Sequence, residues 1–273
     1  VYFPKFFHPD PTVKRQSGFL IPSFKTSANK NTFLIVPYYK VLDVNKDLTF
    51  TPRFYAKDQL LLQTEYREVN EDNKVDIDFS IASENNNELK SHFYYKLNKN
   101  LNFQKFDSSN INLKIENTSN DTYLKGNDIK SPIINSYDLT ENSIKLDLLS
   151  EKLDINADII VYENLNIEKN SDKYQYIFPR INLTKKLNNN TKLDGNFTYN
   201  TNSFIQNYQT NVWEKININN LNFDSNPKVT KKGFYNNYEF LIRNANSDSQ
   251  NSGDYKKGEN FYLSGIFQFN SSL

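Results

Sequence analysis

Apolar and polar residues alternate strictly in many short segments of this chain. In the segment from Lys74 to Ala82, one face reads Val-Ile-Phe-Ile and the other Asp-Asp-Ser-Ala. The same alternation is found in Asp47–Tyr55, Ile111–Glu116, Leu153–Tyr162, Leu193–Asn200 and Phe261–Phe269. A period of two residues is typical of β-strands that show one apolar and one polar face. The sequence therefore predicts an all-β protein.

Short turn signals separate most of these segments. They are Val44–Asp47, Lys57–Asp58, Asn70–Asn73, Glu84–Glu88 and Asn188–Asn190. Short turns between long strands favour antiparallel neighbours in an up-and-down meander. Two longer polar stretches, Thr118–Asn142 and Ala245–Gly258, are predicted to be loops. We count roughly fourteen candidate strands, many near the ~9 to 11 residues that a tilted strand needs to cross a bilayer.

The composition fits a transmembrane β-barrel. Aromatic residues make up 15% of the chain although only 37% is hydrophobic. A barrel explains this because each strand has one face in lipid and one in a wet lumen. The formal net charge of +1 argues against a nucleic-acid partner. The chain has no cysteine and no apolar run of the ~18 residues that a spanning helix needs, and no cofactor is expected.

The stretch from Lys14 to Arg67 reads as four consecutive strands, and the first two each contain a proline. Pro22 lies in GFLIPSF and Pro37 in FLIVPYY. A proline in a strand removes one ladder donor and is normally confined to edges, bulges or strand starts. One interpretation places these prolines at bulges or near strand ends. The other is a deliberately weak seam.

This stretch resembles the LptD family of lipopolysaccharide-assembly outer-membrane proteins. The resemblance is carried by PDPTVKRQSGFLIPSF, the following P-Y-Y strand, DLTFTPR and the EYR ending, and more loosely by SNDTYLKG and FPRI. It implies that residues 1–16 are the end of a periplasmic jelly-roll domain and its linker. Residues 17–273 would then be roughly the N-terminal half of an outer-membrane barrel. Since the chain also lacks methionine, we expect a fragment, with an open, curved sheet.

The resemblance also implies a function, a location and partners. The function is lateral insertion of lipopolysaccharide into the outer leaflet, and the location is the outer membrane of a Gram-negative cell, with the N-terminal end facing the periplasm. The implied partners are lipopolysaccharide, the plug lipoprotein LptE, the periplasmic bridge protein LptA and outer-membrane lipids. Pro22 and Pro37 would flank the lateral gate. Lys14 and Arg15 are candidate contacts for the anionic phosphates of the substrate, although a solvated or headgroup anchor is an equal reading.

Other chemistry is weakly supported. Asp76 with Asp78, and Asp154 with Asp158, share strand faces, and paired carboxylates can hydrolyse glycosides. Lumen lining is the favoured reading because the opposite face is apolar. His8 and His92 lack a third ligand at metal-site spacing, so no metal site and no enzymatic activity are expected. We expect Arg53, Arg67 and Arg180 to pair with lumen carboxylates.

Two alternatives remain open. One is another outer-membrane barrel, a porin or receptor that passes small solutes. The other is a secreted β-sandwich that binds polysaccharide, in which the strand faces would pack on a second sheet.

Overall fold

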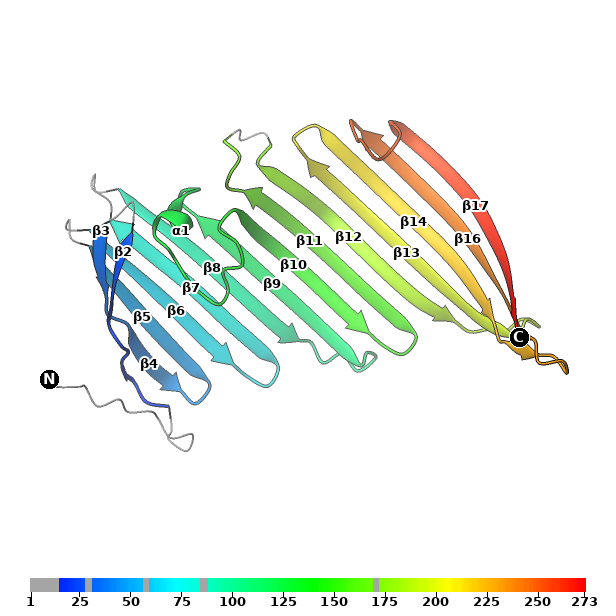
Figure 1. Ribbon diagram of the computed structural model, residues 1–273, viewed down its shortest axis with the longest axis horizontal. Coiled ribbons are helices and arrows are strands. Elements are labelled where there is room, and N and C mark those ends of the chain that lie inside the picture. The colour runs from blue at the N-terminus through cyan, green and yellow to red at the C-terminus, as the bar shows by residue number, and fades with distance from the viewer. Residues whose placement is uncertain (1–14, 28–30, 56–58, 84–87, 169–171) are drawn as a thin grey trace. The chain divides into compact units, whose positions relative to one another are not determined.

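A computed structural model describes residues 15–27, 31–55, 59–83, 88–168 and 172–273. Nearly all of them lie in antiparallel strands that follow one another in an open up-and-down sheet (Figure 1). The predicted all-β meander is therefore confirmed, and no closed barrel is formed. The sandwich alternative is wrong, because all strands of the described residues belong to one sheet.

The strands follow the chain in order. They are β1 Gly18–Phe19, β2 Ser23–Ser27, β3 Asn31–Ile35, β4 Tyr38–Asp43, β5 Lys46–Tyr55, β6 Leu60–Val69, β7 Asn73–Ser83, β8 Leu89–Asn100, β9 Ser108–Thr118, β10 Leu139–Leu149, β11 Leu153–Asn164, β12 Tyr174–Leu187, β13 Gly195–Tyr208, β14 Val212–Ser225, β15 Lys228–Val229, β16 Tyr235–Gln250 and β17 Gly258–Ser272. One short helix, α1, spans Tyr123–Gly126. If β1 with β2 and β3 with β4 are each taken as one interrupted strand and the two-residue β15 is left out, the described segments form fourteen strands.

The chain divides into two compact units. One contains residues up to Tyr94 together with Thr118–Ile133, and the other contains Tyr95–Asn117 and Ile134–Leu273.

In the first unit the usual arrangement of polar and apolar residues is inverted. The buried face of the strands carries Arg53, Gln63, Asp78, Ser80 and His92, each at most 5% exposed. The opposite face exposes large apolar side chains, namely Phe54, Leu60, Phe79 and Phe93. Soluble domains bury apolar groups and rarely bury charged ones. The inversion is the pattern of a sheet that faces lipid on one side and a polar interior on the other.

The second unit has an apolar band that crosses the ladder registers obliquely. One cross-strand row begins as Leu148, Ile155 and Leu183 and continues as Thr201, Asn219 and Asn244. On β13, β14 and β16 the apolar residues of the same face lie nearer the turn end. They include Phe197, Phe223 and Phe240, which pair in register and pack ring against ring.

Strand tilt explains this shift. In a sheet whose strands are ~4.8 Å apart and tilted by ~40°, the residues at one membrane depth shift along the register by roughly one residue from each strand to the next. From β10 to β16 there are five such steps. The row through Leu146 reaches Asn246, whereas Phe240 and Ile242 on the same face of β16 lie six and four positions away. The band therefore runs parallel to the membrane plane if the strands cross the apolar layer at this tilt.

A β-bulge interrupts β12 at Phe178 and Pro179. Asp158 pairs with Arg180 and Ile160 with Ile177, so β12 has one residue more than β11 over this stretch. The ladder to β13 shifts at the same place. The extra residue is in β12, so the bulge bends β12 and leaves the alternation of β11 unbroken. Asp154, Asn156 and Asp158 therefore share one face of β11, as predicted.

Both long loops are shorter than predicted. β16 continues through Gln250, so Ala245–Gln250 is strand and the connection is 251–257. β10 already begins at Leu139, which limits the other connection to 119–138. The polar residues of Ala245–Gln250 resemble a loop in composition, but the backbone of this stretch pairs with β14 and β17. Its side chains also bond along and across strands: Asn246 Nδ2 donates to Asn244 Oδ1 at 2.8 Å, and Lys215 Nζ of β14 donates to Asp248 Oδ2 at 3.4 Å. Among the described residues, no helix is both long and apolar enough to span a membrane.

The oblique band predicts that an arginine at Ile242 costs far more than one at Asn246 on the same face of β16. In the full-length protein folded into lipid vesicles, Ile242→Arg should lower the free energy of unfolding by about 2 to 4 kcal/mol, because the guanidinium would lie within lipid. Asn246→Arg, the matched control, should cost less than about 1 kcal/mol near the interface. Equal costs in urea titrations would contradict the tilted band.

Candidate functional site

Both strands of the first hairpin are broken at their prolines. Leu20 to Pro22 separate β1 from β2, and Val36 and Pro37 separate β3 from β4. Below the break β1 pairs with β4 over two residues, and above it β2 pairs with β3 over five. The backbone N–H of Leu20 donates to the carbonyl of Pro37 at 2.9 Å within the break. The prediction that these prolines thin the ladder agrees with this geometry, while their role in a gate stays a prediction.

Arg15 ties the segment before β1 to the turn end of β5. Its guanidinium pairs with the buried carboxylate of Asp47, which also binds Arg67 Nε at 2.6 Å. It also lies 5.9 Å from the centre of the Tyr39 ring, at cation–π distance. The partner of Arg15 is therefore a carboxylate of the sheet itself, and both the phosphate contact and the solvated or headgroup anchor stay predictions. Lys14 lies outside the described residues.

The connection between β9 and β10 packs on the buried polar face of the first unit. In Figure 1 its helix α1 lies in front of β7 and β8. The hydroxyl of Tyr123 lies 2.7 Å from Ser80 Oγ, which lies 2.7 Å from His92 Nδ1. Leu124 and Ile129 are fully buried. Residues 119–133 therefore cover the polar face as a folded segment, which we call the inner loop.

Arg53 is the strongest polar anchor of the inner loop. Its Nη1 donates to the carbonyls of Asn127 at 2.5 Å and Asp128 at 3.1 Å, and its Nη2 donates to Gln63 Oε1 at 3.0 Å. Gln63 in turn donates to Asp78 and to the carbonyl of Lys130, each at 3.1 Å. Arg53 thus pairs with backbone carbonyls and an amide, and the predicted carboxylate partner is wrong for this arginine.

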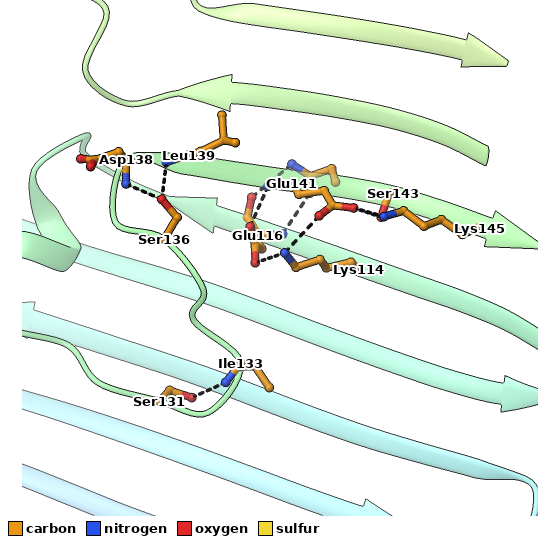
Figure 2. Close-up of polar contacts among 11 residues, drawn as sticks. Lys114, Glu116, Ser131, Ile133, Ser136, Asp138, Leu139, Glu141, Ser143 and Lys145 are labelled. Atoms are coloured by element: carbon orange, nitrogen blue, oxygen red, sulfur yellow. Dashed lines mark hydrogen bonds and ion pairs between the residues drawn. The ribbon is translucent and has the colours of Figure 1, made fainter. Parts of the chain in front are cut away.

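A second polar cluster joins β9 to β10 in the other unit. Figure 2 shows Lys114 between Glu116, 2.7 Å away, and Glu141, 3.3 Å away. Glu141 also pairs with Lys145 at 2.6 Å and accepts a hydrogen bond from Ser143. The backbone N–H of Glu141 donates to Glu116 at 2.6 Å, which locks the two strands where the connection between them begins and ends.

The remaining candidate residues have partners that suit a lining. Asp76 pairs with Lys74 at 3.3 Å, and Asp78 lies 3.3 Å from His92 Nε2. Arg180 binds Asp158 through Nε and Nη2, as predicted. Lys74 and Arg180 neutralise the carboxylates of Asp76 and Asp158, and Asp78 accepts hydrogen bonds from the amide of Gln63. Within the described ranges no group of three metal-ligating side chains occurs, and His8 lies outside them.

The connection 251–257 is held by a buried acid that sequence reasoning missed. Glu214 is 1% exposed and accepts hydrogen bonds from Ser252 Oγ at 2.6 Å and Tyr208 at 2.9 Å. Burial, with the nearby carboxylates of Glu214 and Asp254, raises the pKa of Tyr255 in this connection. The sequence signal was slight, since Glu214 is one of many acids on an alternating strand.

The inner loop was also missed, because Thr118–Asn142 looked like an ordinary polar loop. A usable signal was present in its apolar side chains: Tyr123, Leu124, Ile129 and Ile133 are all buried.

Comparison with known proteins gives several matches of one name, LPS-assembly protein LptD. The relative from Pseudomonas putida F1 is 37% identical over 83 residues, which cover 30% of this chain and 9% of the relative. That from P. putida GB-1 is 50% identical over 54 residues, 20% of this chain and 6% of the relative. That from Pseudoalteromonas translucida is 30% identical over 128 residues, 45% of this chain and 16% of the relative. This chain is similar to the LptD proteins.

The recognition made from the first strands is thereby confirmed. No family model matches the chain. The matched segments span less than a fifth of each of these LptD relatives.

Removing the Arg53 side chain should release the inner loop. In Arg53→Met the carbonyls of Asn127 and Asp128 lose their donor, which costs about 2 to 3 kcal/mol of local stability. We expect trypsin to cleave the full-length protein after Lys125 and Lys130 at least about tenfold faster. Arg243→Met is the control, because Arg243 is exposed and its guanidinium donates to Asn220 on a neighbouring strand rather than to the inner loop. Unchanged cleavage in Arg53→Met would show that the loop is held by its apolar residues alone.

Lys114 should matter more than Lys145. Lys114→Met leaves the buried carboxylate of Glu116 without its cation, and we expect a loss of about 2 kcal/mol in urea unfolding of the full-length protein. Lys145→Met should cost less than about 1 kcal/mol, since its ammonium is more exposed. If both variants lose the same free energy of unfolding, burial of the Lys114 cluster adds no stability beyond that of an exposed ion pair.

Proposed function

We propose that this chain is part of an outer-membrane β-barrel that delivers lipopolysaccharide sideways into the outer leaflet. The observation that carries the proposal is the broken first hairpin, in a chain similar to proteins named for lipopolysaccharide assembly. A lipid with a large sugar head and several acyl chains needs a polar interior for the head and an opening in the wall for the tails. The breaks at Pro22 and Pro37 supply the weak wall.

The energetics favour an opening at this place. A backbone hydrogen bond contributes about 0.5 to 1.5 kcal/mol net, and more where lipid rather than water surrounds it. The ladder of β5 with β6, for comparison, runs without a break over nine residue pairs. The first hairpin instead has two short ladders of two and five pairs. Opening it therefore costs less than separating a longer continuous pair such as β5 with β6.

The two faces of the sheet support a membrane location. The exposed apolar side chains and the oblique apolar band suit lipid, whereas the buried charges suit a polar lumen. A barrel of this kind would stand in the outer membrane of a Gram-negative cell, where lipopolysaccharide is displayed.

The connections at the two ends of the strands support the orientation. Arg15 contacts Asp47 beside the two-residue turn of Val44 and Asn45, so the chain enters at the short-turn end of β5. The much longer connection between β9 and β10, whose residues 119–133 belong to the same unit, follows β9 at the opposite end of the strands. In outer-membrane barrels the short turns face the periplasm, so we place the N-terminal end there.

The proposed partners follow from the resemblance. Lipopolysaccharide and outer-membrane lipids would contact the gate and the outer face, LptE would plug the lumen, and LptA would bridge the periplasm to the domain that residues 1–16 complete. We propose a transport role without enzymatic chemistry, in keeping with carboxylates that are neutralised by lining partners.

Restoring the two ladder donors tests the function. In the full-length protein, Pro22→Ala with Pro37→Ala should strengthen the seam and lower surface lipopolysaccharide severalfold, measured by labelling intact cells. Pro227→Ala, at an exposed turn between β14 and β15, is the matched control and should leave surface levels unchanged. Normal surface lipopolysaccharide in the double variant would count against the gate.

A further inference from the structure

A third proline continues the line of the first two. Pro22, Pro37 and Pro52 follow at equal intervals, since 37 − 22 and 52 − 37 are both 15. In β5, Pro52 lies opposite Val36. The ladder runs Phe33 with Tyr55 to Ile35 with Arg53 above it, and resumes at Tyr38 with Phe50 below it. The three prolines therefore fall at one level of three successive strands.

Pro52 removes a hydrogen bond from one particular ladder. The N–H of Val36 donates to the carbonyl of Pro52 at 3.3 Å. In an antiparallel pair of this kind the two residues exchange both bonds, but proline has no N–H to return. On its other side β5 pairs with β6 without a shift, through Thr51 with Gln63 and Pro52 with Leu62. The missing hydrogen bond therefore belongs to the ladder between β3 and β5, not to the ladder between β5 and β6.

The segments above this line are held together more firmly than they are held across it. β2 and β3 pair over five residues, and three pairs join β3 to β5. The backbone between β2 and β1, and between β3 and β4, leaves the ladder at the prolines. β2 with β3 is therefore a small hairpin whose links to β1 and β4 are interrupted along this line, where its ladder to β5 also loses one bond.

The contacts with the inner loop divide at the same place. Lys25 on β2 reaches Asp128 of the inner loop at 3.7 Å, and both side chains are more than 40% exposed. Arg53 on β5 holds the same loop through buried bonds. An exposed pair is worth little, and a buried charged donor much more. The inner loop thus stays with β5 when β2 moves away.

We propose that Pro52 is a third residue of the gate, and that β2 and β3 swing outward as one flap about the line of Pro22, Pro37 and Pro52. The lower segments β1 and β4 keep their ladder to β5 while the flap opens, and Lys25 with Asp128 is the latch that separates. This inference rests on the proposed function, because it describes how the gate would open.

Two matched disulfides test the flap. Leu34 with Phe54 joins the flap to β5, and Lys40 with Leu48 joins the lower segment to the same strand. Both pairs are directly opposite and an even number of residues from Val36 with Pro52, so they share its face and ladder type. Their Cα atoms should lie about 5.5 Å apart, within disulfide range. The chain has no cysteine of its own.

Surface lipopolysaccharide is measured in cells that carry each full-length double-cysteine variant, oxidised and then reduced. The Leu34→Cys, Phe54→Cys lock should lower delivery at least fivefold and recover on reduction. The Lys40→Cys, Leu48→Cys lock should keep delivery within twofold of wild type. Equal inhibition by both locks, or by neither, overturns the flap while leaving lipopolysaccharide delivery intact. If cells that lack the protein display normal surface lipopolysaccharide, the proposed function itself fails.

Pro52→Val gives an independent measurement without a cross-link. The new N–H can donate to the carbonyl of Val36, so hydrogen exchange of the β3 amides should slow severalfold in the full-length protein. Pro227→Val is the control and should leave β3 exchange unchanged. Unaltered exchange in Pro52→Val would exclude Pro52 from the hinge.

Discussion

The structure depends on polar groups that satisfy one another on one face of a single sheet. Buried charges are costly unless they are paired and hydrogen-bonded, and this chain meets that requirement across neighbouring strands. Asp47 binds Arg15 and Arg67, Asp158 binds Arg180, and Gln63 links Arg53 to Asp78. Because these polar groups find their ion-pair and hydrogen-bond partners on their own face of the sheet, the opposite face can be apolar. The sheet is thus amphipathic in the sense opposite to that of a soluble domain, and the membrane assignment follows from this.

Against that regular background, the first hairpin is the exception. The ladders of β9 with β10 and of β16 with β17 run over seven and fifteen residue pairs, whereas Pro22 and Pro37 cut the first two strands into short pieces. Pro52 removes one more backbone hydrogen bond, and only on the side of β5 that faces this hairpin. The weakness is therefore local and directional. Arg15 and Arg53 sit on either side of it and hold, respectively, the entering segment and the inner loop.

Much of the fold could be predicted from the sequence, because a period of two is a direct consequence of strand geometry. The strands, the meander and the lining roles of Asp158 and Arg67 all followed from alternation. What failed were features set by contacts distant in sequence. Ala245–Gln250 has a loop composition but is strand, because β14 and β17 pair with its backbone on both sides. Arg53 was expected to meet a carboxylate, but the inner loop, about 75 residues away in the chain, brings carbonyls to it. No local pattern encodes such a meeting.

The way in which Arg53 and Gln63 hold the inner loop has a consequence for how this protein can change over generations. Both side chains bind main-chain oxygens of Asn127, Asp128 and Lys130, and every amino acid offers that oxygen. A substitution at Lys130, whose side chain is 68% exposed, leaves these hydrogen bonds intact as long as the backbone path is kept. Asn127 is more constrained, because it is buried and its amide donates to the Tyr123 carbonyl. The exposed side chains of the inner loop can therefore diversify while its docking is preserved by the strands beneath it.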